Sequence, residues 1–124
     1  MRRVLVVDDN PLVRQALCEA FKREADFDVC GEAENGREGI DQANSLQPDV
    51  IVMDFSMPVL NGLEAVRLLN ALMPRVPVII YTAHGGQLVE MEARAAGAAA
   101  TLSKSESVPV LVRTIRSLLD QIAA

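Results

Sequence analysis

Apolar and polar positions follow two kinds of pattern along the chain. Short aliphatic runs, rich in β-branched residues, occur at 4–7, 50–53 and 76–80, and weaker runs occur at 28–32 and 99–102. Strands that are apolar at nearly every position are typical of a parallel sheet buried on both faces. We therefore expect these five segments to be the strands of one sheet.

Between these runs, apolar residues recur at spacings of three and four, the period of an amphipathic helix. The first such segment begins at Pro11, which suits the first turn of a helix, with Asn10 as its N-cap. Further helices are predicted over 37–46, 63–73, 87–96 and 108–122. Gly97 is well placed to end the helix before it. Strands and helices thus alternate five times, which predicts an α/β fold, a doubly wound parallel sheet with helices on both faces.

Length and charge narrow the class of protein. The chain has 124 residues, half of them hydrophobic, which suits one domain over residues 1–124. Its net charge of -5 argues against a protein that binds a phosphate backbone, so we expect no direct contact with nucleic acid. No apolar run approaches the roughly 20 residues of a membrane span, and we expect a soluble, cytoplasmic protein.

The two cysteines fall in elements of different kinds. Cys18 lies in a predicted helix and Cys30 in a predicted strand. A disulfide requires that two Cβ atoms meet, so we expect two reduced thiols instead.

Polar residues stand where four of the predicted strands end. They are Asp8 and Asp9 after the first strand, Asp54 after the third, Thr82 after the fourth and Lys104 near the end of the fifth. Taken singly, each has an ordinary explanation as a helix cap, a strand terminus or a solvated charge. Because the carboxyl ends of parallel strands meet at one edge of a sheet, we expect these side chains to converge there.

Three converging carboxylates repel one another unless a cation lies between them. Oxygen ligands without His or Cys favour Mg²⁺. A metal of this kind beside a hydroxyl and an ammonium group suits phosphoryl chemistry, in which Asp54 is the best candidate for the nucleophile. The loop that follows it contains Pro58 and Gly62, which fix a sharp turn, although an ordinary strand-to-helix turn explains both residues equally well.

Four segments together resemble the receiver domain of bacterial two-component response regulators. They are "VLVVDDNP", "VIVMDFSMPVLNGLE", "PVIIYTA" and "GAAATLSK", and the resemblance extends over essentially the whole chain. It implies a CheY-like, flavodoxin-type fold with strand order 2-1-3-4-5. The stretches "VLVVDDNPLVRQAL" and "VIIYTA" look closest to receivers joined to helix-turn-helix effectors of the nitrate-response type (NarL/LuxR).

The resemblance assigns a role to each polar residue. Asp54 would be the phosphoacceptor. Asp9, Asp54 and the backbone carbonyl of Ser56 would hold Mg²⁺ directly, while Asp8 would act through water. Thr82 and Lys104 would then bind the phosphoryl oxygens, and small Ala83 would leave access to the site.

The same resemblance implies partners and a switch. The donor would be a phosphohistidine on a sensor histidine kinase or phosphotransfer protein. Phosphorylation would remodel the face made by the fourth helix, the fifth strand and the fifth helix. This face or the last helix is a candidate surface for a homodimer, and a C-terminal DNA-binding effector domain is a candidate for the output. The chain itself would be a signalling domain and not an enzyme.

Four positions depart from the family or vary within it. Thr101 stands where many receivers carry an aromatic residue that reports activation, so coupling through an aromatic is in doubt. Ser105 stands where proline commonly follows the lysine, which predicts a loop that is more mobile or differently arranged. Ser56 and His84 flank the path of the hydrolytic water and are candidates for setting the lifetime of the phosphorylated form.

Three other functions remain open at this stage. An aspartate-nucleophile phosphatase would carry a second acid two residues after the nucleophile, where this chain has Ser56. A flavin-binding protein would carry a loop rich in Gly, Ser or Thr after the first strand, where "DDNPLVR" would repel phosphate. A receiver that acts without phosphorylation, as an interaction domain, is the third. The broad apolar stripe of the last helix fits either a wide core face or a partner surface.

Overall fold

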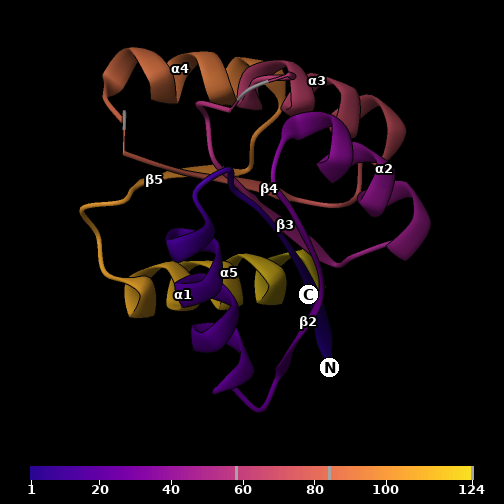
Figure 1. Ribbon diagram of the computed structural model, residues 1–124, viewed down its shortest axis with the longest axis vertical. Coiled ribbons are helices and arrows are strands. Elements are labelled where there is room, and N and C mark those ends of the chain that lie inside the picture. The colour runs from indigo at the N-terminus through magenta and orange to yellow at the C-terminus, as the bar shows by residue number, and fades with distance from the viewer. Residues whose placement is uncertain (58, 84, 124) are drawn as a thin grey trace.

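Strands and helices alternate along the chain, as the apolar pattern predicts. The computed structural model describes residues 1–57, 59–83 and 85–123. The elements are β1 (Arg2–Val7), α1 (Pro11–Lys22), β2 (Phe27–Ala33), α2 (Gly36–Leu46), β3 (Val50–Met53), α3 (Gly62–Leu72), β4 (Val78–Thr82), α4 (Gln87–Ala96), β5 (Ala100–Ser103) and α5 (Val108–Ala123). The strands form a parallel sheet in the order β2-β1-β3-β4-β5. This confirms the predicted fold and strand order (Figure 1).

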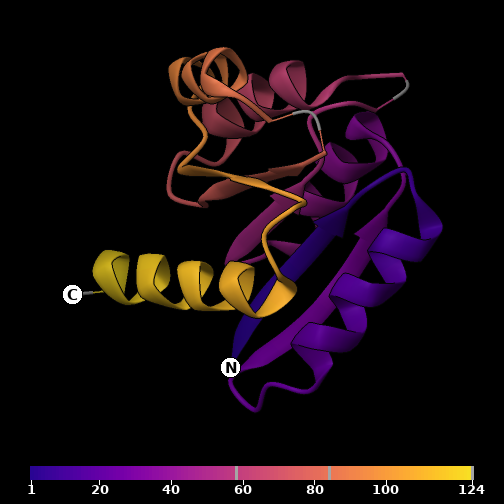
Figure 2. The same cartoon turned by 90° about the vertical axis from the view of Figure 1, so that its left-hand side faces the viewer.

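Helices cover the sheet on both faces. Helices α2, α3 and α4 lie on one side and α1 and α5 on the other (Figures 1 and 2). Successive side chains of β1 point to opposite faces of the sheet. Leu5 and Val7 pack against α2 and α3. Val4 and Val6 pack against α1 and α5. A strand with two buried faces has no polar position, which explains the unbroken apolar runs.

Asparagine side chains cap the N-termini of helices α1, α2 and α3. Asn10 accepts hydrogen bonds from the first backbone N–H groups of α1, Asn35 does so for α2 and Asn61 for α3. Helix α4 ends at Gly97, whose φ of +115° is in the left-handed region that favours glycine. The predicted caps at Asn10 and Gly97 are confirmed.

Strand boundaries depart from the apolar pattern where polar residues continue a ladder. The pattern predicts a strand over 76–80, but β4 runs from Val78 to Thr82 because Thr82 still pairs with Ser103. Likewise β1 begins at Arg2, which pairs with Phe27. Backbone pairing does not depend on side-chain polarity, so these ends are invisible to the hydrophobic pattern.

Most apolar residues of the last helix, α5, pack in the core. Leu111, Val112, Ile115 and Leu119 are buried against the sheet, whereas Ile122 remains 55% exposed. A broad core face therefore accounts for most of the stripe. No helix in the described part of the chain is long and apolar enough to span a membrane.

Both cysteines are free thiols, as predicted. Burial raises the pKa of Cys18 to about 11, with a smaller contribution from the charge of Glu32. A thiol of this kind remains protonated at neutral pH and is a poor nucleophile.

Candidate functional site

The residues predicted to converge lie together at the carboxyl edge of the sheet. Asp8 and Asp9 follow β1 and Asp54 follows β3. One carboxylate oxygen from each of these three residues lies within 4.8 Å of the others. Thr82, the last residue of β4, and Lys104, directly after β5, come from the two neighbouring strands.

Lys104 joins two of the three carboxylates. Its Nζ lies 2.8 Å from Oδ2 of Asp8 and 3.3 Å from Oδ2 of Asp54. The backbone N–H of Lys104 donates to the carbonyl of Thr82 at 2.8 Å, which anchors the base of this side chain. Burial disfavours the ammonium ion, but the hydrogen bond to Asp8 and the charge of Asp54 raise the pKa of Lys104, so it carries a positive charge in the site.

The carboxyl group of Asp54 has a raised pKa. Burial raises its pKa, the charge of Lys104 opposes this shift, and the charge of Asp8 adds to it. Its Oδ1 is buried and has no hydrogen-bond partner among the described residues. A buried oxygen without a partner is costly in a native protein and suits a site that binds a further ligand.

The turn after β1 holds the acidic pair in two different environments. Asp8 is buried, and its Oδ1 accepts a hydrogen bond from the backbone N–H of Asn10 at 2.9 Å. Asp9 is exposed at the edge of the site. The backbone carbonyl of Asp8 accepts from Arg14 at 2.7 Å, a contact that the apolar pattern and the motif did not reveal.

The loop after β3 depends on a close approach of two backbone segments. A Cβ at Gly62 would lie 2.4 Å from the carbonyl oxygen of Asp54, and the N–H of Gly62 donates to the carbonyl of Phe55 at 2.8 Å. Glycine is therefore required where α3 begins against the end of β3. Ser56 is exposed and, with Asp9, borders a shallow depression in this loop. Pro58 and His84 lie outside the described residues.

The loop after Lys104 is held by local hydrogen bonds. The Oγ atoms of Ser103 and Ser105 are 2.8 Å apart, and the N–H of Ser105 donates to Oγ of Ser103 at 3.1 Å. Tyr81 of β4 donates its hydroxyl to the carbonyl of Glu106 at 2.8 Å. Sequence reasoning missed Tyr81, although a lone tyrosine in an aliphatic strand is a signal that its hydroxyl needs a buried partner. Thr101 lies in β5, and its Oγ1 is buried with no hydrogen-bond partner among the described residues.

The donor set fits a hard divalent cation. The cluster consists of carboxylate oxygens, and Asp54 also has an oxygen, Oδ1, without a hydrogen-bond partner among the residues described. Such ligands suit Mg²⁺, which binds proteins through one or two carboxylates and keeps several waters.

Comparison with known proteins identifies the family. The model of the family "Response regulator receiver domain" matches residues 4–116. The chain belongs to the response regulator receiver domain family. Receiver domains are signalling domains of two-component systems that bind Mg²⁺ at an acidic pocket and interact with histidine kinases or phosphotransfer proteins, and Asp8, Asp9 and Asp54 form such a pocket here.

Similar proteins carry receivers in several settings. A protein-glutamate methylesterase/protein-glutamine glutaminase of Hahella chejuensis is 44% identical over 105 residues, covering 83% of this receiver and 27% of that protein. The chemotaxis protein CheY of Thermotoga maritima is 38% identical over 97 residues, covering 78% of this receiver and 80% of that protein. A two-component response regulator of the LuxR family from Aurantimonas superposes with a TM-score of 0.93 at 30% identity, covering 98% of this receiver and 86% of that chain. The receiver thus spans about a quarter of the methylesterase relative.

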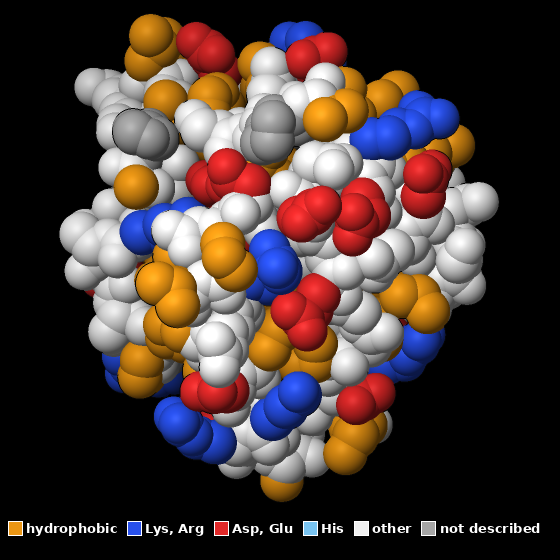
Figure 3. All heavy atoms as spheres, in the orientation of Figure 1, with side chains coloured by type: hydrophobic (Ala, Val, Ile, Leu, Met, Phe, Trp, Pro, Cys, Tyr) orange, Lys and Arg blue, Asp and Glu red, His pale blue; other side chains and the backbone are white. Residues whose placement is uncertain are grey.

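Charges on the receiver are mixed on the face seen in Figure 3. Acidic and basic side chains are interspersed there, and the whole chain has a net charge of -5. On this face the mixed charges differ from the clustered basic surface that is typical of a nucleic-acid binder.

Proposed function

We propose that this receiver accepts a phosphoryl group on Asp54, with Mg²⁺ as the cofactor and a phosphohistidine of a sensor kinase or phosphotransfer protein as the donor. One observation carries this proposal: Asp54 is a buried carboxylate that shares the ammonium group of Lys104 with Asp8, and one of its oxygens has no hydrogen-bond partner among the described residues. Family membership supports the donor class.

The residues of the pocket would bind the metal in two ways, directly or through a water. Asp9, Asp54 and the backbone carbonyl of Ser56 would bind Mg²⁺ directly, and Asp8 would act through a water. When bound, the metal offsets the negative charge on the phosphoryl oxygens. Lys104 would contribute the second positive charge, since its ammonium group already lies 3.3 Å from Asp54.

The transfer needs no acid or base from the chain. An oxygen of the Asp54 carboxylate forms a bond to phosphorus while the bond between phosphorus and the donor nitrogen breaks. The electron pair of the broken bond stays on that nitrogen, and because the other ring nitrogen carries a proton, the donor leaves as neutral imidazole. Thr82 and Lys104 would bind the phosphoryl oxygens of the product.

The phosphorylated state would act through a shift in population. Contacts between the phosphoryl group and Thr82 or Lys104 favour one arrangement of α4, β5 and α5 over another. Thr101 occupies the position where an aromatic residue would report this change, so we do not expect coupling through an aromatic side chain there. Ser56 and His84 are proposed to tune the lifetime of the phosphorylated form.

The output of the natural protein is a separate proposal. The fold supports a DNA-binding effector of the NarL/LuxR type, because the LuxR-family regulator superposes over 98% of this receiver. A methylesterase effector is the second candidate, favoured by the 44% identity to the Hahella chejuensis protein. We also propose that the receiver is cytoplasmic. It would form a homodimer through the α4-β5-α5 face or through α5. The receiver itself would be a phosphoacceptor and not an enzyme.

Two alternatives predict a different response to a small phosphodonor. A phosphatase would turn over continuously, and Ser56 stands where its second acid would be. A receiver that acts without phosphorylation would form no adduct.

A small phosphodonor tests the proposal directly. The receiver is incubated with acetyl phosphate and Mg²⁺, and intact mass is measured before and after treatment with hydroxylamine, which cleaves acyl phosphates. We expect one phosphoryl group on wild type, no adduct on Asp54→Asn, and an unchanged adduct on Asp49→Asn, an aspartate at the opposite edge of the sheet that accepts from the N–H of Arg3. An equal adduct on Asp54→Asn, or none on wild type with Mg²⁺, contradicts the proposal.

A further inference from the structure

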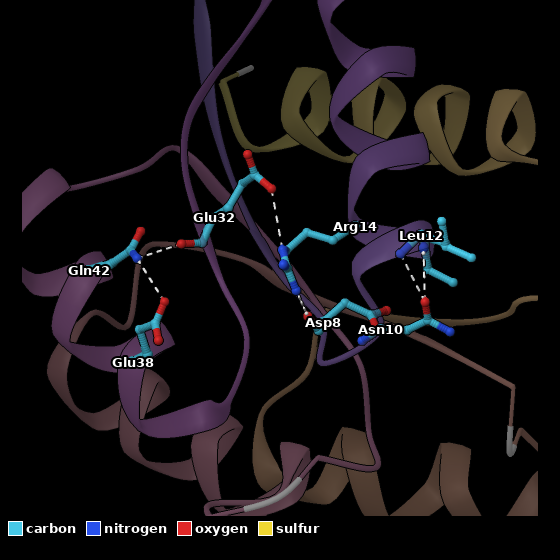
Figure 4. Close-up of polar contacts among 8 residues, drawn as sticks. Asp8, Asn10, Leu12, Arg14, Glu32, Glu38 and Gln42 are labelled. Atoms are coloured by element: carbon cyan, nitrogen blue, oxygen red, sulfur yellow. Dashed lines mark hydrogen bonds and ion pairs between the residues drawn. The ribbon is translucent and has the colours of Figure 1, made fainter.

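The guanidinium group of Arg14 lies behind the acidic pair. In Figure 4 it stands between the backbone of Asp8 and the side chain of Glu32. Its Nη1 donates to the backbone carbonyl of Asp8 at 2.7 Å, and its Nε lies 3.3 Å from Oε1 of Glu32. The side chain of Arg14 is only 19% exposed. Arg14 thus joins α1 and β2 to the peptide unit between Asp8 and Asp9.

That peptide unit sets the direction of Asp9. The N–H of Asp8 still belongs to the sheet, donating to the carbonyl of Ala33 at 3.0 Å. The carbonyl of Asp8 belongs to the turn, beyond the last paired residue of β1. Arg14 donates a hydrogen bond to this carbonyl and so holds the plane of the peptide bond between Asp8 and Asp9. The orientation of that peptide plane sets the direction in which the side chain of Asp9 points.

The far end of the guanidinium is anchored as well. Glu32 is in β2, and its own backbone carbonyl accepts a hydrogen bond from the Gln42 side chain of α2, which also contacts Glu38 (Figure 4). Arginine presents several donors in a rigid planar fork, so one group can bind a carbonyl and a carboxylate at a fixed angle. A lysine would carry the same charge without this fork.

We propose that Arg14 is a positioning residue for the metal site: by holding the carbonyl of Asp8 against Glu32, it keeps the Asp8-Asp9 turn in the geometry that binds Mg²⁺. This inference rests on the proposed function, because it assigns to Arg14 a part in the same site. The guanidinium group of Arg14 bonds to the carbonyl of Asp8 and to Glu32, so it would act on the metal site through the backbone.

Charge and geometry predict opposite effects at this position. Arg14 is a cation close to an acidic cluster, so its charge alone opposes Mg²⁺. If charge were its only effect, Arg14→Ala would bind Mg²⁺ more tightly. If Arg14 positions the turn, Arg14→Ala binds Mg²⁺ more weakly, about tenfold for the loss of a group that orients metal ligands.

The experiment is a Mg²⁺ titration of the receiver, followed by the amide chemical shifts of residues around the site. We expect the dissociation constant to rise about tenfold in Arg14→Ala and to rise in Arg14→Lys as well, since lysine keeps the charge but not the fork. Arg116→Ala is the matched control. Arg116 is partly buried, pairs with Asp26 and Glu24 at 2.8 Å, and lies against the loop before β2 instead of the pocket. We expect its Mg²⁺ affinity to be unchanged.

The outcomes separate this inference from the proposed function. Unchanged or tighter Mg²⁺ binding in Arg14→Ala, with wild type binding normally, overturns the role of Arg14 alone. A wild-type receiver that does not bind Mg²⁺ overturns the proposed function and this inference with it. Urea denaturation of each variant shows that it is folded, and Arg14→Lys supplies the answer if Arg14→Ala does not fold.

Discussion

Asp54 is held in the fold at an energetic disadvantage. Burial raises the pKa of Asp54 and the charge of Asp8 adds to this shift, whereas Lys104 and a hydrogen bond with Thr82 lower the pKa. The raised pKa means that the folded state holds the proton of Asp54 more tightly than the unfolded state does. Function at this residue therefore opposes stability, as is common at sites built to bind a charged ligand.

This imbalance predicts a pH dependence of stability. Without Mg²⁺, the ionisation of Asp54 lowers the free energy of unfolding as pH rises from the ordinary aspartate pKa, about 4, through the raised pKa of the folded state. Asp54→Asn has no such ionisation. We expect the variant to gain stability relative to wild type as pH rises through this window, and the difference to level off above it.

Urea denaturation from pH 4 to pH 7 in the presence of a chelator measures this difference. A difference that is independent of pH, or that shrinks as pH rises, contradicts the raised pKa of Asp54. Asp49→Asn serves again as the control, because Asp49 lies at the opposite edge of the sheet.

Tyr81 gives a second prediction for a single side chain. Its hydroxyl donates to the carbonyl of Glu106 and ties β4 to the loop after Lys104. Tyr81→Phe removes that hydroxyl and keeps the ring, so we expect a loss of about 1 kcal/mol in the free energy of unfolding. Faster amide exchange should follow at 104–107. An unchanged free energy of unfolding and unchanged exchange would show that this hydrogen bond does not hold the loop.

Among the elements, α4 is the least firmly held of the helices around the site. Helix α3 has a side-chain cap at Asn61 and buries three aliphatic or small residues besides its first glycine. Helix α4 begins after Gly86, and within the described part of the chain it has no side-chain cap and buries only Ala93 and Ala96. Leu88 and Met91 of α4 are more than 60% exposed. Elements that change arrangement are drawn from the less stable parts of a fold.

Hydrogen exchange measured by NMR tests this ranking of helices. We expect the amides of α4 to exchange faster than those of α3 in the unphosphorylated receiver, because fewer buried contacts must break for α4 to open. Asn61→Ala should narrow the gap by weakening the cap of α3, at a cost of about 1 kcal/mol. Equal protection of α3 and α4 would contradict the assignment of α4 as the looser element.

At the scale of the whole molecule, the acidic pocket links metal binding to folding. Its carboxylates come from β1 and β3, two strands that meet only in the folded sheet. The unfolded chain therefore lacks the site, and Mg²⁺ should bind the native state alone. Binding of this kind raises the free energy of unfolding by mass action.

The stabilisation can be measured as a shift in melting temperature. At ten times its dissociation constant, Mg²⁺ should add about 1.4 kcal/mol. For a domain of this size, the corresponding rise in Tm is roughly 4 to 7 °C. We expect most of the rise to disappear in Asp9→Asn and to persist in Asp49→Asn. An equal rise in Asp9→Asn would mean that Mg²⁺ acts elsewhere on the receiver.

The apolar pattern by itself determined the order of the elements. Its change of period marked each strand and helix, because a strand buried on both faces is apolar at every position, whereas a helix buried along one stripe is apolar at every third or fourth position. It also placed Asp8, Asp9 and Asp54 at strand ends, and the rule that parallel strands end at one edge was enough to bring them together. The strand order came from the resemblance to receivers. The apolar run itself stopped short of Thr82, the last residue of β4, since backbone pairing leaves no hydrophobic signal.

Only the tertiary structure decided which groups touch. Lys104 lies nearer to Asp8 than to Asp54, and Tyr81 reaches the loop after Lys104. Arg14, which reads as an ordinary helix cation, instead spans from Glu32 to the carbonyl of Asp8. Such contacts join residues on different strands and helices, and their distances follow from strand register and helix packing. The local periodicity of apolar residues contains no information on strand register or on helix packing. The sequence can therefore place charged residues at one edge of the sheet without showing which contacts hold them there.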